Sequence, residues 1–192
     1  MGIEERRARD RAARRELIIG TARKLAEAEG WDAVTTRRLS TEIEYSQPVL
    51  YKHFSGMDEI AHSVATDGFG ELAEKLREAR SCAQTPEDGL RQVAQAYMNF
   101  SRENPALYDA MFIRATTLRF ASADTPPQLS AAFNELRETI TAVVREPDAD
   151  TFTEVFWAAL HGLAALARSG RLRPRHDSHR VEVLVSQFSA KR

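Results

Sequence analysis

Apolar residues recur along almost the whole chain at the three- and four-residue spacing of one helix face. Leu17, Ile18, Ala22 and Leu25 form the first such stripe and, with Gly30 after it, predict a helix over about 8–29. No segment alternates apolar and polar residues convincingly, so strands are not expected. Further stripes run through Leu39–Ile43, Leu50–Phe54, Ile60–Leu76, Leu90–Tyr97, Leu129–Val144, Phe152–Leu163 and Val181–Phe188. The pattern predicts an all-α protein of about nine helices.

Several predicted helices begin with residues that cap a helix N-terminus. Thr85-Pro86-Glu87-Asp88 places a hydroxyl at the N-cap, a proline in the first turn and an acid at the third helical position. Thr125-Pro126-Pro127-Gln128 repeats that order with an amide, and Asn104-Pro105 is a shorter version. Ser55 precedes a fourth candidate start. Such side chains accept hydrogen bonds from first-turn N–H groups that have no partner inside the helix, so each motif predicts a helix start.

The stretch from Thr35 to Ile60 predicts two short helices joined by a tight turn. The first begins after Thr35, and Ser46 caps the second, which has Pro48 in its first turn. Each helix has only two or three apolar residues, so neither can bury a core without the first predicted helix against it. The expectation is therefore a three-helix unit at the N-terminus.

The third helix of that unit carries polar and charged groups on its outward face. They are Gln47, Tyr51, Lys52 and His53. An amide, a phenol and cations suit base edges and phosphates in a DNA major groove. The alternative is a surface helix without a binding role.

Charge is distributed unevenly over a chain whose formal net charge is only −1. Between positions 6 and 24 the only acids are Asp10 and Glu16. The basic residues there are Arg6, Arg7, Arg9, Arg11, Arg14, Arg15, Arg23 and Lys24. Clustered arginine and lysine are typical of a surface that binds phosphates, which favours a polyanion as the partner. A solvated helix face explains the same composition equally well.

The motifs over about residues 10–65 resemble the TetR family of bacterial transcriptional regulators. The resemblance rests on Thr35-Thr36-Arg37 opening the second helix and on Gln47-Pro48-x-Leu50-Tyr51-x-His53-Phe54 on the third. It implies a helix-turn-helix repressor that binds double-stranded DNA, at a palindromic operator, as a homodimer. It also implies that Gln47, Pro48 and His53 face bases, while Thr36, Arg37, Tyr51 and Lys52 chiefly hold the phosphate backbone. The DNA-binding residues expected here are Arg11, Arg15, Thr35, Thr36, Arg37, Ser46, Gln47, Pro48, Tyr51, Lys52 and His53.

Two positions depart from the family pattern. Glu44 stands at the turn position that glycine usually holds, so either this residue adopts a positive φ, at about 1 kcal/mol, or the turn is rearranged. Met57 stands where a lysine usually follows the aromatic residue, which removes one expected phosphate contact. Either difference alters details of DNA docking.

The resemblance implies two domains, a helix-turn-helix DNA-binding domain over 1–57 and a ligand-sensing and dimerisation domain over 58–192. Trp157-Ala-Ala-Leu-His161-Gly162 resembles the Trp-x-x-x-His-Gly signature of one TetR C-terminal subclass. Family members dimerise through their last two long helices, here near 149–169 and 177–189. The interface residues expected from this are Ala158, Gly162, Ala165, Val181, Leu184, Val185 and Phe188. A tightly packed core helix explains the small residues among them equally well.

The same resemblance implies a pocket for an unknown small-molecule effector between core helices. Polar groups and methionines lie among the apolar stripes, as a pocket with few polar anchors requires. The candidate ligand residues are Tyr97, Met98, Tyr108, Met111, Phe112, Arg114, Phe133, Trp157 and His161, with Arg119 as a further polar group. The alternative is that these are satisfied core residues. Ligand binding is expected to shift the long fourth helix, in which Gly68 and Gly70 permit either a bend or close packing.

Other function classes find little support in the sequence. No glycine-rich phosphate loop or catalytic triad order is present, so neither an enzyme nor a cofactor is expected. His176 and His179 flank the start of a helix without further ligands, so no metal site is expected. No apolar run reaches the length of a membrane span, and a cytoplasmic, nucleoid-associated protein is expected. The remaining alternatives are a ligand-independent architectural DNA-binding protein and a helical protein–protein module.

Overall fold

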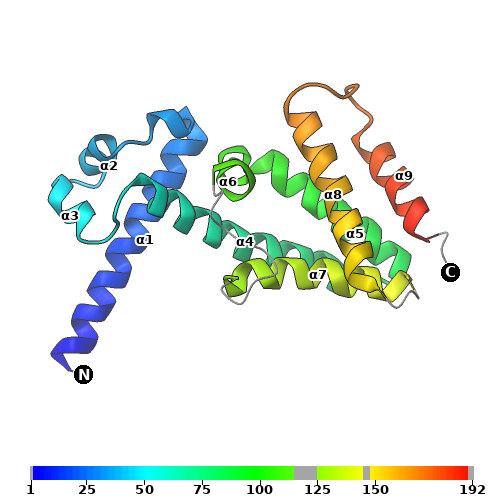
Figure 1. The fold of residues 1–192 in the computed structure, drawn as a ribbon, viewed down its shortest axis with the longest axis horizontal. Helices are drawn as coiled ribbons and strands as arrows, with labels where there is room; N and C mark the ends of the chain where they lie inside the picture. The colour runs from blue at the N-terminus through cyan, green and yellow to red at the C-terminus, as the bar shows by residue number, and fades with distance from the viewer. Residues whose placement is uncertain (1, 115–124, 145–147, 190–192) are drawn as a thin grey trace. The chain divides into compact units, whose positions relative to one another are not determined.

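The computed structural model describes residues 2–114, 125–144 and 148–189 (Figure 1). These residues form nine α-helices and no strand, which confirms the predicted all-α fold. Among the described helices, none combines the length and apolar character that a membrane span requires. The helices are α1 Ile3–Glu29, α2 Thr36–Glu42, α3 Gln47–Tyr51, α4 Met57–Ser81, α5 Pro86–Glu103, α6 Pro105–Asp109, α7 Pro127–Val143, α8 Ala149–Arg168 and α9 Asp177–Ser189.

Two shorter helical segments complete the described chain. A 3₁₀ turn, η1, spans Trp31–Ala33, and a π-helical segment, η2, spans Ala110–Arg114 directly after α6. The described residues divide into two compact units, within α4, between Gly68 and Phe69. The first unit contains 2–68 and 104–114, and the second contains 69–103, 125–144 and 148–189.

The first unit is built on α1. Ile18, Ala22 and Leu25 of α1 are buried, as are Leu39 of α2 and Leu50 of α3. The two short helices therefore each contribute a buried leucine to a core that α1 provides, as the sequence predicts. Leu17, which belongs to the predicted stripe, is instead 45% exposed, because its neighbour in sequence occupies the inward side of the helix.

α1 begins at Ile3, five residues before its predicted start. The apolar stripe gives no signal there, because residues 2–14 are all exposed. Acidic residues occupy the first turn, where the helix dipole favours negative charge. The carboxylate of Glu5 accepts a hydrogen bond from the N–H of Gly2 at 2.9 Å, which closes that turn.

Residues 104–114 belong to the first unit because polar contacts attach α6 to α1. The carboxylate of Glu27 accepts hydrogen bonds from the N–H groups of Ala106 at 3.0 Å and Leu107 at 2.9 Å. The indole N–H of Trp31 donates to the carbonyl of Ala106 at 2.8 Å. The side-chain oxygen of Asn104 accepts from Arg23 at 3.0 Å and does not cap α6, although the helix begins where Asn104-Pro105 predicts.

The second unit is arranged around α5, which contacts α7, α8 and α9. Leu90, Val93 and Ala94 of α5 are fully buried, and so are Phe156 and Leu160 of α8. Apolar faces at helical spacing therefore build this core, in agreement with the stripes in the sequence.

The predicted caps of this unit have different outcomes. The hydroxyl of Thr85 accepts from the N–H of Asp88 at 3.1 Å, so the predicted cap of α5 is confirmed. For α7 the N-cap residue is Pro126, so the helix begins one residue later than Thr125-Pro126-Pro127-Gln128 predicts. The reason lies in the pair of prolines: α7 begins at Pro127, and Pro126 rather than Thr125 directly precedes it.

Candidate nucleic-acid interface

The turn between α2 and α3 has the geometry of a helix-turn-helix with an unusual residue in it. The hydroxyl of Thr35 accepts from the N–H of Arg38 at 3.1 Å, which caps α2 at the predicted position. Glu44 has φ of 56°, so this glutamate adopts the left-handed conformation that favours glycine. The N–H of Tyr45 donates to the carbonyl of Ser40 at 3.0 Å and closes the turn. Of the two possibilities left by the sequence, the turn is therefore retained with a positive φ.

α3 directs its polar side chains to solvent. Leu50 is only 1% exposed and fixes the inward side of the helix. Ser46 is the N-cap residue, but its side chain makes no capping hydrogen bond. Tyr51 is 54% exposed. The predicted residues on the exposed surface around α3 are Ser46, Gln47, Pro48, Tyr51 and Lys52.

The start of α2 adds further polar groups to the first unit. Thr35 and Arg37 are exposed there and Thr36 is half-buried. On α1 Arg11 is exposed, whereas Arg15 is half-buried.

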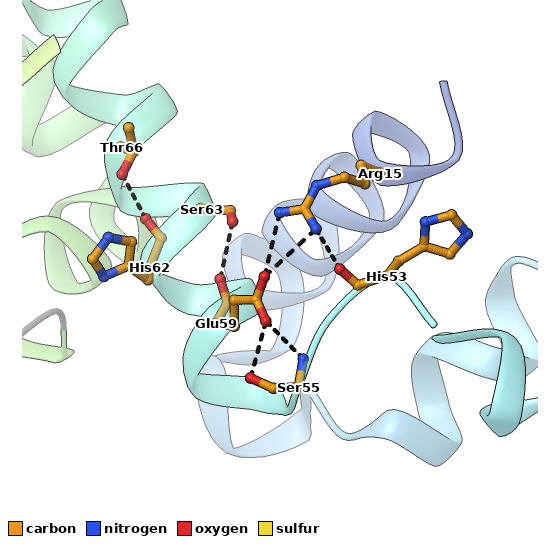
Figure 2. A network of polar contacts seen from close by, with 7 residues as sticks. All are labelled: Arg15, His53, Ser55, Glu59, His62, Ser63 and Thr66. Atoms are coloured by element: carbon orange, nitrogen blue, oxygen red, sulfur yellow. Dashed lines mark hydrogen bonds and ion pairs between the residues drawn. The ribbon is translucent and has the colours of Figure 1, made fainter. Parts of the chain in front are cut away.

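A network of polar contacts around Arg15 fixes the end of α3 (Figure 2). The guanidinium of Arg15 donates to the backbone carbonyl of His53 and to a carboxylate oxygen of Glu59, the latter at 3.5 Å. It also lies over the ring of Phe54, 4.1 Å from the ring centroid. The other carboxylate oxygen of Glu59 accepts from the N–H and the hydroxyl of Ser55, at 2.7 and 2.9 Å. One arginine and one glutamate thus connect α1, the segment after α3 and the first turn of α4.

The electrostatics of this network follow from its hydrogen bonds. The N–H and hydroxyl of Ser55 hold the pKa of Glu59 below its ordinary value, and Arg15 lowers it further. Burial is the main cause that lowers the pKa of His53, and the nearby charges of Arg11, Arg14, Arg15 and Lys52 add to this shift. Figure 2 shows the His53 ring directed away from Glu59. The shift favours the neutral form of the His53 ring.

The sequence motifs did not identify Glu59, although a signal for it exists. Ser55 lies four residues before Glu59 at the start of α4, which is near the spacing of a capping box. Met57, at the position where a lysine was expected, is the first residue of α4 and is half-buried. Glu27, which holds α6, has no local signal, because its partners lie about eighty positions away.

The candidate ligand residues fall into both units. In the second unit, the indole N–H of Trp157 donates to the hydroxyl of Tyr97 at 3.2 Å, and Met98 is buried. Phe133 and His161 are half-buried there, and burial lowers the pKa of His161. These five residues therefore include one directly bonded pair.

The other candidates belong to the first unit. The rings of Tyr108 and Phe112 are 4.6 Å apart, and Met111 is 2% exposed. Arg114 lies over the ring of Trp31 at 5.6 Å and pairs with Asp32 at 3.8 Å, on the surface of the helix-turn-helix unit. Arg119 lies outside the described residues. Within the described segments, no three His, Cys, Asp or Glu side chains gather as metal ligands would.

The candidate dimer residues lie on different sides of their helices. On α8, Ala158 and Ala165 are exposed, and a Cβ added to Gly162 would meet no atom within 4 Å. On α9, Val181, Val185 and Phe188 are buried within the same unit, whereas Leu184 is half-buried. The ring of Phe188 lies 5.1 Å from that of Phe156, which links α9 to α8. The α8 residues thus form a surface, and the α9 residues form mostly core.

Comparison with known families identifies both parts of the chain. Residues 18–64 match the model described as bacterial regulatory proteins, tetR family. Residues 90–188, more than half of the chain, match the tetracyclin repressor-like C-terminal domain. The chain belongs to the TetR family. It is a helix-turn-helix transcriptional regulator and not an enzyme.

Individual relatives of this TetR-family chain are distant in sequence. An HTH-type transcriptional regulator of Mycobacterium tuberculosis, Rv0681, is 25% identical over 161 residues, which are 81% of this chain and 71% of that protein. The TetR-family regulator PfmR of Thermus thermophilus superimposes with a TM-score of 0.63 at 18% identity, over 90% of this chain and 97% of PfmR. RolR in complex with resorcinol superimposes with a TM-score of 0.69 at 17% identity, over 94% of this chain and 89% of RolR. The two structures share the fold. The Trp157-x-x-x-His161-Gly162 signature stays a prediction.

Proposed function

We propose that this TetR-family regulator is a repressor that binds a palindromic operator as a homodimer and is released by a small molecule. The observation that carries the DNA-binding part is α3, whose polar side chains are exposed while Leu50 anchors it and Arg15 holds its end. A short helix with a fixed end and a free polar face is what major-groove recognition requires.

The DNA contacts divide by chemistry. Gln47 and Pro48, at the exposed start of α3, face base edges. The side-chain amide of Gln47 can form two hydrogen bonds with one adenine. His53, after the end of α3, also faces bases. The phosphate backbone is held by hydroxyls and cations that hydrogen-bond or pair with phosphate oxygens. Those residues are Thr35, Thr36, Arg37, Ser46, Tyr51, Lys52 and Arg11. Arg15 acts by holding the carbonyl of His53 in place, so its effect on DNA binding passes through the position of α3.

The homodimer forms through the exposed apolar side of α8. Ala158, Gly162 and Ala165 permit the close approach of a partner helix, and Val155 and Leu166 beside them are 56% and 40% exposed. Leu184 of α9 contributes at the edge of this surface, while Val181, Val185 and Phe188 support it from the core. Dimerisation would bring two recognition helices to half-sites about 34 Å apart.

The division of roles follows the proposed domains, 1–57 for DNA and 58–192 for sensing and dimerisation. The ligand site involves the Tyr97–Trp157 pair of the second unit. Met98, Phe133 and His161 of the same unit contribute to it. The complex of RolR with resorcinol supports a small aromatic molecule as the kind of effector. Ligand binding acts on the helix-turn-helix through α4 and through residues 104–107, which Glu27 and Trp31 attach to α1. The protein acts in the cytoplasm, at the nucleoid.

The test selects duplexes from a random DNA pool with the purified full-length chain and measures binding of the enriched duplex. We expect a palindrome bound by two chains, and we expect Gln47→Ala to reduce the preference over scrambled DNA by about tenfold, which is the low end of the effect of one bidentate base contact. Non-specific affinity should change much less. The control is Gln84→Ala, an exposed glutamine of the second unit, which should bind as the unchanged protein does. Equal losses of Gln47→Ala on both duplexes would contradict specific recognition by α3.

The effector is tested separately. A thermal-shift screen of small aromatic molecules should find a compound that raises the unfolding temperature and weakens binding to the selected duplex, because a ligand of the native state stabilises it. A compound that stabilises the protein without changing DNA affinity would contradict ligand-controlled release.

A further inference from the structure

A small cavity lies within the first unit, beside the start of α4. Its volume is about 220 Å³. The residues that line it come from η1 and the position after it, from the first turns of α4 and from the end of η2. They are Trp31, Val34, Met57, Asp58, Ala61 and Arg114, all of the first unit. Drug-sized ligands occupy about 300–1,000 Å³, so this cavity suits a smaller molecule.

Four of the lining residues give the cavity a fixed apolar wall. Trp31, Val34 and Ala61 are at most 9% exposed. The indole N–H of Trp31 donates to the carbonyl of Ala106 at 2.8 Å, which sets the orientation of the ring. Met57 stands where the family pattern has a lysine, so this side of the cavity carries a thioether in place of a second cation. A wall formed before the ligand arrives lowers the cost of ordering side chains on binding.

Arg114 supplies a cation that other groups hold only loosely. Its guanidinium lies over the ring of Trp31, 5.6 Å from the ring centroid. Its ion pair with Asp32 is 3.8 Å long, beyond hydrogen-bond length, and the side chain of Asp32 is fully exposed. Within the described part of the chain, no group accepts a hydrogen bond from Arg114. A guanidinium has five N–H donors in a planar fork that fits a carboxylate in two places, so these donors are available to an anionic group in the cavity.

Asp58 supplies the opposite charge. It is exposed in the first turn of α4, and among the described residues its carboxylate has neither a hydrogen-bond nor an ion-pair partner. The next residue, Glu59, is by contrast engaged by Ser55 and Arg15. The helix dipole alone favours an acid at this position, but the carboxylate of Asp58 also lines the cavity together with Arg114. A ligand with a single charge would be repelled by one of these two groups.

We propose that this cavity binds a small zwitterion of the amino-acid type, whose carboxylate pairs with Arg114 and whose ammonium group pairs with Asp58. The side chain of the ligand packs on Trp31. Opposite charges on one ligand match both protein side chains, whereas a neutral aromatic molecule leaves both unpaired. The inference goes beyond the proposed function, whose ligand site belongs to the second unit. It places the ligand on the turn of α4 that also carries Glu59, whose contact with Arg15 helps to hold the end of α3.

The experiment uses the purified full-length chain at about pH 6, where the amino group of an amino-acid amide stays protonated. Differential scanning fluorimetry with each standard L-amino acid identifies compounds that raise the unfolding temperature, and isothermal titration calorimetry measures their affinity. The best compound is compared with its amide, which lacks the carboxylate, and with its N-acetyl derivative, which lacks the ammonium group. Arg114→Gln and Asp58→Asn remove the matching charges from the protein, and circular dichroism verifies that both variants fold.

We expect at least one amino acid to bind the unchanged protein and each substitution to weaken binding at least tenfold, as the loss of one charge-assisted hydrogen bond does. Arg114→Gln should have no further effect on the amide, and Asp58→Asn none on the N-acetyl derivative, because each pair of changes removes the same contact. Arg114→Lys keeps the charge without the planar fork and should retain part of the affinity. The control is Arg171→Gln, which removes an exposed arginine of the second unit and should bind as the unchanged protein does.

Three outcomes would overturn the inference. Failure of every amino acid to bind would exclude this class of ligand. Equal losses from Arg114→Gln and Arg171→Gln would mean a general effect of charge. Binding that Trp157→Phe abolishes and Arg114→Gln leaves unchanged would assign the compound to the ligand site of the second unit. The last outcome would support the proposed function while contradicting this site.

Discussion

The two units of the chain reach a defined structure by different means. In the first unit, two helices of seven and five residues are fixed by individual polar contacts, from the cap by Thr35 to the Arg15–Glu59 network. In the second unit, helices of 13 to 20 residues are held by apolar faces around α5. Polar contacts require particular residues at particular positions, whereas an apolar face accepts many residues. The first unit is therefore recognisable from its motif, and the second chiefly from its periodicity.

The largest effect expected from this difference is at Phe156 in the second unit. Its side chain is fully buried and contacts the ring of Phe188, at 5.1 Å between centroids. Phe156→Ala should lower the free energy of unfolding by about 3–5 kcal/mol, because it removes buried apolar surface and leaves a cavity. Chemical denaturation at one fixed protein concentration measures this value.

The control for that prediction is the neighbouring Val155→Ala. Val155 is 56% exposed, so its truncation should change the free energy of unfolding by about 0.5 kcal/mol or less. A loss from Phe156→Ala no larger than that of the control would show that the apolar core does not hold this unit.

The same contrast explains how much the sequence predicts. The positions of α2 and α3 follow from Thr35, Ser46 and Pro48, and the structure confirms them. The sequence does not predict whether the apolar residues of α9 face the chain's own core or a partner helix. Val181, Val185 and Phe188 fit a stripe that either the chain's own core or a partner helix can cover, and periodicity does not distinguish the two.

Contacts distant in the sequence are the other limit. Residues 104–114 lie within the predicted C-terminal domain, yet Glu27 and Trp31 attach them to α1. A glutamate on a polar helix has many possible roles, so no local pattern predicts that Glu27 binds the N–H groups of α6. The backbone conformation of Glu44 is likewise not predicted by the local sequence. The turn could either keep a positive φ at this residue or be rearranged, and the surrounding structure selects φ of 56°.

Gly68 of α4 makes a close apolar contact in the first unit. Replacing it tests whether polar contacts alone fix the helices of this unit. A Cβ added to Gly68 would lie 2.7 Å from Leu107 Cδ1 and 2.9 Å from Met111 Sδ. Both side chains are at most 2% exposed and have little room to move. Overpacking costs about 1–3 kcal/mol and alanine gains about 1 kcal/mol over glycine in a helix, so Gly68→Ala should lower the free energy of unfolding by about 1 kcal/mol.

Gly70→Ala is the matched control two residues further along α4. Its added Cβ would lie 3.5 Å from Gln128, an ordinary contact, so the helix propensity of alanine should dominate. The free energy of unfolding should then rise by about 0.5–1 kcal/mol. Opposite signs for the two variants support close packing as the role of Gly68. A rise for both would leave a bend in α4 as its explanation.

The smallest expected effect belongs to the polar contacts of the first unit, at Arg15 and Glu59. Their side chains are 36% and 38% exposed and 3.5 Å apart, so water screens the pair and the expected coupling is about 0.5 kcal/mol. A double-mutant cycle of Arg15→Met and Glu59→Gln measures it. Lys75→Met with Glu78→Gln is the control, because that pair is 61% and 62% exposed and should couple more weakly.

The same network makes the free energy of unfolding depend on pH through Glu59. The pKa of Glu59 is lowered below 4.5, first by the hydrogen bonds of Ser55 and then by Arg15. The unfolded chain therefore binds a proton that the folded chain resists, so Glu59 stabilises the fold above pH 4.5 and loses this effect as the pH falls through the folded pKa. Glu59→Gln should flatten the fall in unfolding free energy between about pH 5 and pH 3. The network would not be what holds the end of α3 if the pH dependence of the unfolding free energy were unchanged and the two substitutions lowered that free energy additively. The contrast between the two units would then rest on the Thr35 cap and the turn at Glu44.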